Sequence, residues 1–269
     1  MLFRQLLHEP LSAASYLIGC PAAGVAAVVD PSLSAEQYAL LAADRGLRIT
    51  AVLETHMHAD YISNGRALAE LTGAQLYLPR RADARFPHQP IDDGWQLQLG
   101  EVLLRALHTP GHTPEHVAFV LAQGGRLADP WAVLTGDCLF VGDVGRADLL
   151  DLPLSGAAQL YESLQRLRAL PETTEVYPTH YGGSPCGGKG MSGKPSSTIG
   201  YERRYNPLLG ASNLAAFQVL LDETPRSAID AILHNRNTNR GELPLPARYG
   251  EIRAELGAIR AFTLQQASA

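Results

Sequence analysis

The pattern of apolar residues divides the chain into segments that predict strands and segments that predict helices. Short runs rich in Val, Ile, Leu and Ala, closed by Gly, Pro or Asp, predict strands over 14–19, 24–30, 48–54, 74–78, 95–99, 102–107, 117–121, 131–134 and 175–178. Apolar residues at helical spacing predict helices that begin near Ser34, Ser63 and Ser155, and further helices over 214–221 and 248–262. Strands that alternate with helices, together with hairpin-like pairs, favour an α/β fold of packed layers with mixed sheets.

Capping residues mark the beginnings of the first two helices. Ser34 and Gln37 have the spacing of a capping box, in which each residue satisfies a backbone N–H of the other. In the helix that follows, Leu40 and Leu41 are expected to point into the core. Ser63 is expected to cap the next, shorter helix. Each of these helices follows a predicted strand, as a helix that covers a sheet does.

Length and composition describe an ordinary globular protein. The 269 residues are 46% hydrophobic and 18% charged, and we expect one domain over 1–269 with a helical C-terminal extension at about 199–269. The net charge of -5 gives no sign of a surface for nucleic acid or anionic membranes, and no apolar run approaches the roughly 18 residues of a membrane span. The N-terminus lacks the features of a secretion signal, and three sparse cysteines suit a reducing compartment. We therefore expect a cytoplasmic protein.

The loop that follows the predicted strand over 48–54 carries the first candidate chemistry. Residues two apart point the same way where a strand ends still extended, so His56, His58 and Asp60 would converge on one point. Two imidazoles and a carboxylate aimed together make a site for zinc, iron or manganese. The alternative is three polar residues on a solvated loop.

Three further strands end in loops of the same kind. The sequence His-Thr-Pro-Gly-His-Thr-Pro-Glu-His occupies 108–116, Thr-Gly-Asp-Cys-Leu-Phe occupies 135–140, and Tyr-Pro-Thr-His-Tyr occupies 177–181. A single histidine is more often a core or surface residue than a ligand. Ligands do gather at strand ends in α/β folds, however. Four such loops in one chain therefore indicate a shared metal site.

The order of these loops, H-x-H-x-D, T-P-G-H-T, T-G-D-x-L-F and P-T-H, resembles that of the metallo-β-lactamase fold. The match runs from about residue 15 to His180. The resemblance implies a four-layer αββα sandwich with mixed sheets and a metal at one edge between them. The segments 15–20, 141–148 and 196–204 look like the persulfide dioxygenase branch, closest to members that often carry rhodanese domains. We expect no such appended domain in this chain.

In that branch, the resemblance assigns the metal to His56, His112 and Asp137. Two histidines and one carboxylate are the ligand set associated with non-haem Fe(II) and dioxygen chemistry. One Fe(II) per chain is therefore expected, with zinc as a substitute, and the three protein ligands leave open positions for a substrate sulfur and O2. The catalytic residues expected around the metal, where they orient ligands or handle protons, are His58, Asp60 and His180.

The reaction that the resemblance implies is the oxidation of a low-molecular-weight thiol persulfide by O2 to sulfite and the free thiol. Glutathione, coenzyme A, bacillithiol and thiosulfate all remain open as the thiol carrier. No nucleic-acid or membrane partner is expected, and the resemblance allows a homodimer.

Hydrolases of the same superfamily are the main alternative. Members such as glyoxalase II read H-x-H-x-D-H and hold two metal ions, so resemblance to them would give a zinc-dependent thioesterase or lactonase. Here Tyr61 stands at the position of the last histidine, and a phenol with a pKa near 10 is a poor ligand. The persulfide dioxygenase branch often has an aromatic residue there. The sequence thus favours one iron over two zinc ions, and the intact ligand set disfavours a non-catalytic interaction module.

Substrate contacts are expected from Tyr181, from Lys189 and Lys194 in one Gly-rich loop, and from Arg203. Lys189 and Lys194 are the only lysines of the chain, and their charges would meet the carboxylates or phosphates of the thiol carrier. The same loop nearly spells a phosphate-binding P-loop. Pro195 replaces the Ser or Thr that would hold Mg²⁺, so we reject nucleotide hydrolysis.

Two cysteines and one charged pair complete the candidate residues. Cys138 is expected to pack in the core, whereas Cys186 is expected to lie exposed in the Gly-rich loop, where it is the better candidate for a reactive thiol. Arg146 and Asp148 are expected to form a charged pair that braces their turn.

Overall fold

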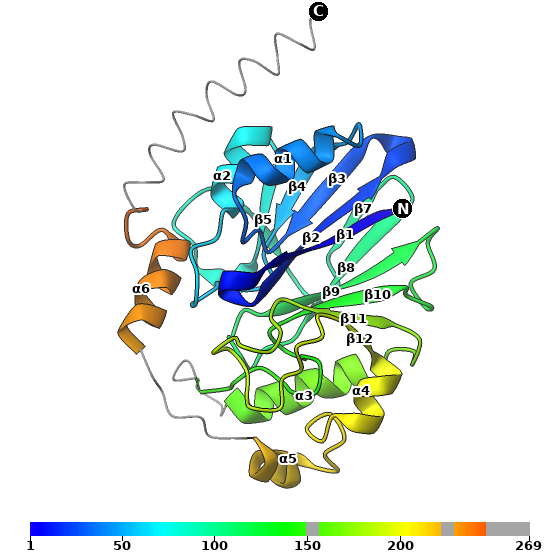
Figure 1. Ribbon diagram of the computed structural model, residues 1–269, viewed down its shortest axis with the longest axis vertical. Coiled ribbons are helices and arrows are strands. Elements are labelled where there is room, and N and C mark those ends of the chain that lie inside the picture. The colour runs from blue at the N-terminus through cyan, green and yellow to red at the C-terminus, as the bar shows by residue number, and fades with distance from the viewer. Residues whose placement is uncertain (149–155, 222–228, 246–269) are drawn as a thin grey trace, which may run out of the picture.

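Two six-stranded sheets face each other in the computed structural model, which describes residues 1–148, 156–221 and 229–245 (Figure 1). The first sheet has the order β1-β2-β3-β4-β5-β6. Its strands are β1 (Leu2–His8), β2 (Ala13–Cys20), β3 (Val25–Val29), β4 (Arg48–Leu53), β5 (Gln75–Pro79) and β6 (Gln89–Ile91). The first three strands pair antiparallel and β3 to β6 run parallel, so this sheet is mixed.

The second sheet has the order β12-β11-β10-β9-β8-β7. Its strands are β7 (Gln96–Leu99), β8 (Val102–His108), β9 (Val117–Gln123), β10 (Ala132–Gly136), β11 (Glu175–Pro178) and β12 (Ser197–Thr198). Only the β10–β11 pair runs parallel among the strand pairs of this sheet in the described chain. Both sheets are therefore mixed, as the sequence predicted.

Helices cover the outer face of each sheet. Helices α1 and α2 lie against the first sheet, α3, α4 and α5 lie on the side of the second, and α6 lies at the edge of the sandwich (Figure 1). Their bounds are α1 (Ala35–Ala43), α2 (Gly65–Thr72), α3 (Gly156–Arg168), α4 (Ile199–Tyr205), α5 (Leu214–Leu220) and α6 (Ile229–Arg240). Short 3₁₀ turns occupy Glu9–Leu11, Pro21–Ala23 and Arg80–Ala82.

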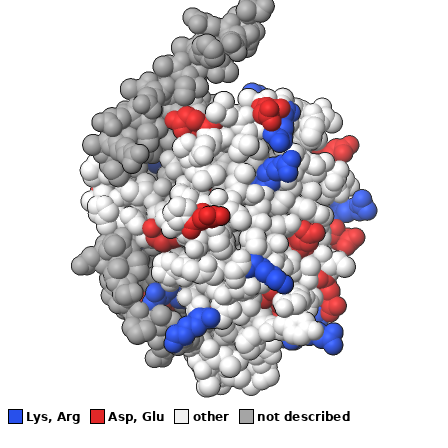
Figure 2. All heavy atoms as spheres, viewed as in Figure 1, with Lys and Arg blue, Asp and Glu red and all other residues white. Residues whose placement is uncertain are grey.

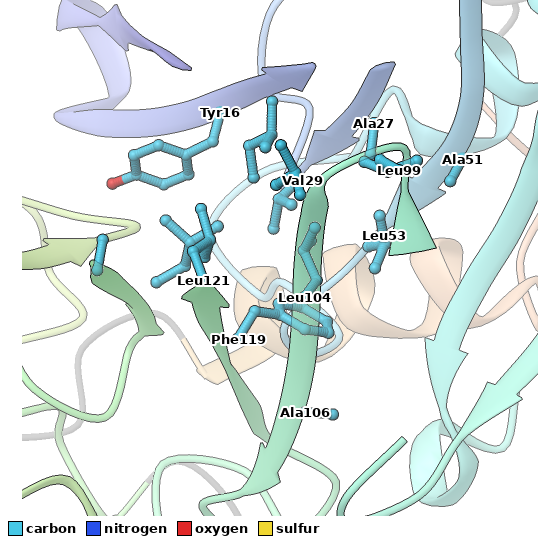
Figure 3. Close-up of a cluster of buried hydrophobic side chains, with 14 of the residues drawn as sticks. Tyr16, Ala27, Val29, Ala51, Leu53, Leu99, Leu104, Ala106, Phe119 and Leu121 are labelled. Carbon is cyan, nitrogen blue, oxygen red and sulfur yellow. The ribbon is translucent and has the colours of Figure 1, made fainter. Parts of the chain in front are cut away.

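The central core lies between the sheets. Inward residues of both, among them Leu53, Leu104 and Phe119, form one buried cluster (Figure 3). Burying a side chain of this size contributes about 1.5–3 kcal/mol. The hydroxyl of Tyr16 on β2 also donates a hydrogen bond of 2.5 Å to the carbonyl of Pro178 on β11, which ties one sheet directly to the other. This contact fixes the edge of the sandwich at which the strands of both sheets end in the candidate loops.

Two outer clusters complete the layers. Tyr38, Val52 and Leu68 belong to the cluster between the first sheet and its helices. Leu164 and Phe217 belong to the cluster between the second sheet and its helices. Three apolar clusters separate four layers of secondary structure, so the fold is the expected αββα sandwich.

Most predicted elements are confirmed, and the differences are instructive. Strands β1, β6 and β12 were not predicted, because edge strands that are short or only half buried lack a clear alternation. The capping box of α1 is present, with the N–H of Ser34 donating to Gln37 Oε1 at 3.1 Å. The expectation for Leu40 was wrong: it is 66% exposed, because Tyr38 and Ala42 form the inward face of α1. The helix expected over 248–262 lies outside the described residues.

The surface carries charges of both signs. Figure 2 shows acidic and basic side chains interspersed over the face in view, without a single-sign field. Within the described ranges, every helix is too short or too polar to traverse a bilayer.

Candidate metal centre

His56, His112 and Asp137 meet at the edge between the sheets. They follow β4, β8 and β10, and their side chains are buried. His112 Nε2 lies 3.3 Å and His56 Nε2 3.7 Å from Asp137 Oδ2. One ligand atom of each residue lies within 4.8 Å of the others. The three residues predicted as metal ligands are therefore brought together.

The opposite ring nitrogens hold the two imidazoles in place. His56 Nδ1 lies 2.9 Å from Thr55 Oγ1, and His112 Nδ1 donates to the carbonyl of Arg146 at 2.9 Å. This leaves both Nε2 atoms turned toward Asp137, and that of His56 is buried without a hydrogen-bond partner. Burial, together with neighbouring imidazoles, lowers the pKa of His56 well below its ordinary value, and burial also lowers the pKa of His112. Two neutral imidazoles with inward lone pairs fit a metal ion.

Asp137 completes this set as an anion. Burial alone would raise the pKa of its carboxyl, but His180 first and then His112 lower it well below the ordinary value. The sequence alone assigned no role to His116 in the second motif. In the structure, His116 holds Asp137 in place. Its Nε2 accepts the backbone N–H of Asp137 at 2.9 Å, and its Nδ1 donates to Thr109 Oγ1 at 2.8 Å. His116 is therefore a positioning group for the carboxylate ligand.

A second group of side chains lies on the other side of Asp137. His180 Nδ1 donates to Asp137 Oδ1 at 2.8 Å, and its Nε2 lies 2.7 Å from Asp60 Oδ2. Burial would lower the pKa of His180, but the carboxylates of Asp137 and Asp60 raise it to about 10. Cys186 joins them, with ligand atoms of Asp60, His180 and Cys186 within 4.8 Å of one another. Two residues predicted as catalytic, Asp60 and His180, therefore adjoin the metal ligands.

His58, the third predicted catalytic residue, groups with two buried carboxylates. Its Nε2 lies 3.2 Å from Asp30 Oδ1 and 3.2 Å from Glu54 Oε2, and its Nδ1 is buried without a hydrogen-bond partner. Asp30 also accepts hydrogen bonds from the N–H and Oγ1 of Thr55, at 2.7 and 2.8 Å, and from Thr179 Oγ1 at 2.7 Å. Asp30, which directly follows β3, thus ties two of the four loops to the first sheet. The catalytic role of His58 stays a prediction.

Tyr61 lies where the hydrolases have their additional histidine. Its ring stacks on His58, with centroids 4.5 Å apart and an interplanar angle of 24°. The hydroxyl is buried without a hydrogen-bond partner, and burial raises the pKa of the phenol well above its ordinary value. A neutral phenol held in this way is a poor metal ligand, as the sequence indicated.

Helix α6 holds the first metal loop, a role that the sequence did not reveal. Asn239 Nδ2 donates to the carbonyls of His58 and Tyr61, both at 2.8 Å. Arg236 forms two hydrogen bonds with the buried Glu115, at 2.8 and 3.1 Å, and Glu115 Oε1 also accepts the N–H of Met57 at 3.1 Å. In the sequence, the only sign of this role was Glu115 in the second motif, because a buried glutamate needs a partner for its charge.

The predicted substrate residues lie in different surroundings. The Tyr181 hydroxyl is buried without a hydrogen-bond partner, and Lys189 is exposed. Lys194 is exposed, with its ammonium 6.0 Å from the ring centroid of Tyr201 on α4. Arg203, also on α4, lies 3.1 Å from Glu172. The structure thus places Lys194 and Arg203 with α4, and the substrate contacts stay predictions.

Of the expectations for Cys138, Cys186 and the Arg146–Asp148 pair, two are confirmed and one was wrong. Cys138 is fully buried in the core, as predicted. The expectation that Cys186 is exposed was wrong, because the Gly-rich loop folds inward and leaves this residue only 4% exposed. The predicted pair of Arg146 and Asp148 is confirmed, with Nε and Oδ1 2.7 Å apart.

Comparison with known proteins identifies the class. The model of the metallo-β-lactamase superfamily matches residues 8–180, so the chain belongs to that superfamily. Persulfide dioxygenase ETHE1, mitochondrial, of Bos taurus is 32% identical over 216 residues, which cover 79% of this chain and 77% of that protein. The solved structure of ETHE1 from Myxococcus xanthus has 31% identity and a TM-score of 0.74, and the match covers 89% of this chain and 98% of that one.

Hydrolases are equally similar. Hydroxyacylglutathione hydrolase of Rhodospirillum rubrum is 35% identical over 168 residues, which cover 61% of this chain. The matched part spans only 60% of the length of that hydrolase. The family, an enzyme superfamily with a metal site of histidines and aspartate, is therefore shared by proteins of two different activities.

Proposed function

We propose that this protein is a mononuclear non-haem iron dioxygenase that oxidises a low-molecular-weight thiol persulfide to sulfite and the free thiol. The observation that carries the proposal is the buried set of two neutral imidazoles and one carboxylate formed by His56, His112 and Asp137. This set is typical of Fe(II) that works with O2. Similarity to persulfide dioxygenase ETHE1 over most of both chains supports the same reaction.

The overall reaction is R–S–SH + O2 + H2O → R–SH + SO3²⁻ + 2 H⁺. The outer sulfur loses four electrons to O2, the S–S bond breaks, and the inner sulfur leaves as the thiol. Bound iron supplies the redox chemistry and open positions for sulfur and O2. The chain holds the ligands in place through Thr55 and the carbonyl of Arg146. His180 holds a proton at Nε2, beside Asp60, and the departing thiolate can take the proton from this nitrogen.

Tyr61 supports a single iron rather than the paired ions of the hydrolases. Its neutral, buried ring stacks on His58 in place of a third nitrogen ligand. The histidine set that would hold a second ion in the hydrolase manner is therefore incomplete.

Oxygen uptake with glutathione persulfide tests the proposal. Protein loaded anaerobically with Fe(II) is expected to consume O2 and release sulfite in equal amounts. His112→Ala should abolish both, because it removes a metal ligand. His108→Ala is the matched control: His108 begins the same motif, but its Nε2 faces the carbonyl of Pro114 at 3.1 Å, and it should retain activity. Uptake no greater than that of His112→Ala would refute the proposal.

A zinc-dependent thioesterase of the glyoxalase II kind is the second candidate. The observation that favours it is His58 Nδ1, a buried nitrogen without a hydrogen-bond partner beside the ring of His56, 4.3 Å away between centroids. Hydrolysis of a hydroxyacylglutathione thioester by the zinc-loaded protein distinguishes the two. Turnover of the thioester, with no oxygen uptake by the ferrous form, would favour the hydrolase.

A further inference from the structure

The Gly-rich loop, residues 182–197, binds an acidic side chain of its own chain. Residues 188–195 nearly match a P-loop, in which backbone N–H groups bind phosphate oxygens. In the structure, Oδ2 of the Asp143 carboxylate accepts the N–H of Gly190 at 2.8 Å. A Cβ added at Gly188 would lie 2.7 Å from the same oxygen, and one added at Gly190 would lie 3.0 Å from it. The two glycines therefore let a carboxylate approach the backbone where a P-loop holds phosphate.

Asp143 is also fixed from its other sides. The residue is only 6% exposed, and its Oδ1 accepts the N–H of Val144 at 2.8 Å. Its carbonyl accepts the N–H of Phe140 and a hydrogen bond from Asn206 Nδ2, both at 3.0 Å. Hydrogen bonds to an ionised carboxylate are stronger than those between neutral groups. Asp143 thus joins the Gly-rich loop to its own turn and to the end of α4.

Glu202 on α4 gives the same two segments a second attachment. This glutamate is fully buried, and its Oε2 accepts the N–H of Gly142 at 2.9 Å. Its Oε1 accepts the hydroxyl of Ser197, the last residue of the Gly-rich loop, at 2.5 Å. Between these points, the N–H of Ser192 donates to the carbonyl of Val141 at 2.9 Å. The Gly-rich loop is therefore held along its length.

The backbone that follows Asp143 contacts two metal ligands. A Cβ added at Gly145 would collide with the carbonyl oxygen of Asp137 and would lie 3.4 Å from the Cβ of His112. The carbonyl of the next residue, Arg146, accepts a hydrogen bond from His112 Nδ1 at 2.9 Å. The course of this backbone therefore sets where the carboxylate and one imidazole of the metal centre lie.

We propose that Asp143 is a positioning residue for the metal centre and that the Gly-rich loop binds this carboxylate instead of a phosphate. Held by the loop, Asp143 fixes the backbone over 144–146, and that backbone fixes Asp137 and His112. Groups that support metal ligands in this way typically change metal affinity by about 10- to 100-fold. The inference rests on the metal centre of the proposed function, but not on the reaction proposed there.

Titration of the full, metal-free chain with Co(II) tests the role of Asp143. Asp143→Asn keeps the shape of the side chain, but an amide has one acceptor oxygen for the two backbone N–H groups that the two carboxylate oxygens now accept. One of them loses its partner, so Co(II) should bind about 10- to 100-fold more weakly. The visible absorption of the bound Co(II) should also change, because the ligands have moved.

Two alanine variants of the Gly-rich loop form a matched pair. Gly188→Ala places a methyl group against Asp143 and should weaken Co(II) binding as Asp143→Asn does. Gly193→Ala should bind Co(II) like the wild type, since no heavy atom of the described chain lies within 4 Å of the added Cβ. Urea unfolding of the metal-free variants separates positioning from stability. A merely structural role would lower the unfolding free energy and leave the Co(II) affinity and spectrum of the folded chain unchanged.

The possible outcomes separate this inference from the proposed reaction. Co(II) affinity and absorption equal to those of the wild type in both Asp143→Asn and Gly188→Ala would overturn it. Binding of inorganic phosphate to the metal-free wild type, abolished by Gly188→Ala, would also overturn it. Weakened Co(II) binding by Asp143→Asn, in a protein whose ferrous wild type consumes no O2, would support the inference and overturn the dioxygenase proposal alone. A wild type that binds no Co(II) would overturn the metal centre and this inference together.

Discussion

Replacing Arg236 by glutamine should destabilise the protein by about 3–5 kcal/mol, the typical effect of breaking a buried ion pair. Arg236 on α6 donates to both carboxylate oxygens of Glu115 and to the carbonyl of Met57, at 3.3 Å. The side chain of Glu115 is fully buried and that of Arg236 is 8% exposed. The substitution therefore leaves a carboxylate in the protein interior without its counter-ion.

The effect should be large enough to measure by heating. At about 2–4 °C per kcal/mol for a chain of this size, the melting temperature should fall by roughly 6 to 20 °C. The double variant Glu115→Leu with Arg236→Met should recover most of the loss, because it leaves no unpaired charge. Recovery should be incomplete, since Glu115 also accepts the N–H of Met57 at 3.1 Å.

Urea unfolding of the metal-free proteins gives the comparison directly, because bound metal would add its own stabilisation. Arg80→Gln is the matched control. Arg80 also makes two hydrogen bonds to one carboxylate, that of Asp92, at 2.7 and 2.6 Å, but the two side chains are 59% and 57% exposed. Exposed pairs contribute little, so this variant should unfold like the wild type.

A loss in Arg236→Gln no greater than that in Arg80→Gln would refute the reasoning. It would mean that water reaches Glu115 when its partner is removed. Helix α6 would then be held to the metal loop mainly by Asn239.

Three further predictions follow from other parts of the structure. Tyr61→His should raise Co(II) binding by the metal-free chain from one equivalent to two, because it supplies the nitrogen ligand of the hydrolases; a stoichiometry equal to that of the wild type would contradict this. Leu104→Ala in the central core should lower the unfolding free energy by about 2–5 kcal/mol, whereas Leu40→Ala, at a position 66% exposed, should change it little in the same urea measurement. Burial raises the pKa of the Glu115 carboxyl, but Arg236 lowers it further, so that the pKa in the folded protein lies below the ordinary value of 4.5. The stability that the pair contributes is therefore present above pH 4.5 and is lost as the pH falls below that value. Urea unfolding of the metal-free chain at several pH values should show this decline, and Glu115→Gln should flatten it.

Most strands and helices could be predicted from the sequence because the hydrophobic pattern is local, whereas the four-layer order came from the family resemblance. Buried strands such as β4 and β9 contain continuous apolar runs, and α1 begins at a capping box. The face of a helix is less certain, as Leu40 shows, since a nine-residue helix with apolar residues on several sides has no single inward face. Only contact with the first sheet selected Tyr38 and Ala42.

The metal ligands were also within reach of the sequence. His56, His112 and Asp137 each follow a strand of apolar residues, and in layered α/β proteins such strand ends converge at one edge. The motif order supplied the rest through resemblance. Residue type and position after a strand indicated a shared metal site, and only the resemblance selected these three residues as its ligands.

Contacts between residues far apart in the chain were decided only by the tertiary structure. Glu115 and Arg236 are separated by 121 positions, and Asn239 and His58 by 181. No local pattern marks such partners, because burial and pairing depend on how the layers pack. For the same reason, Cys186 looked like an exposed thiol in a Gly-rich loop, yet the folded chain places it in the interior beside Asp60 and His180.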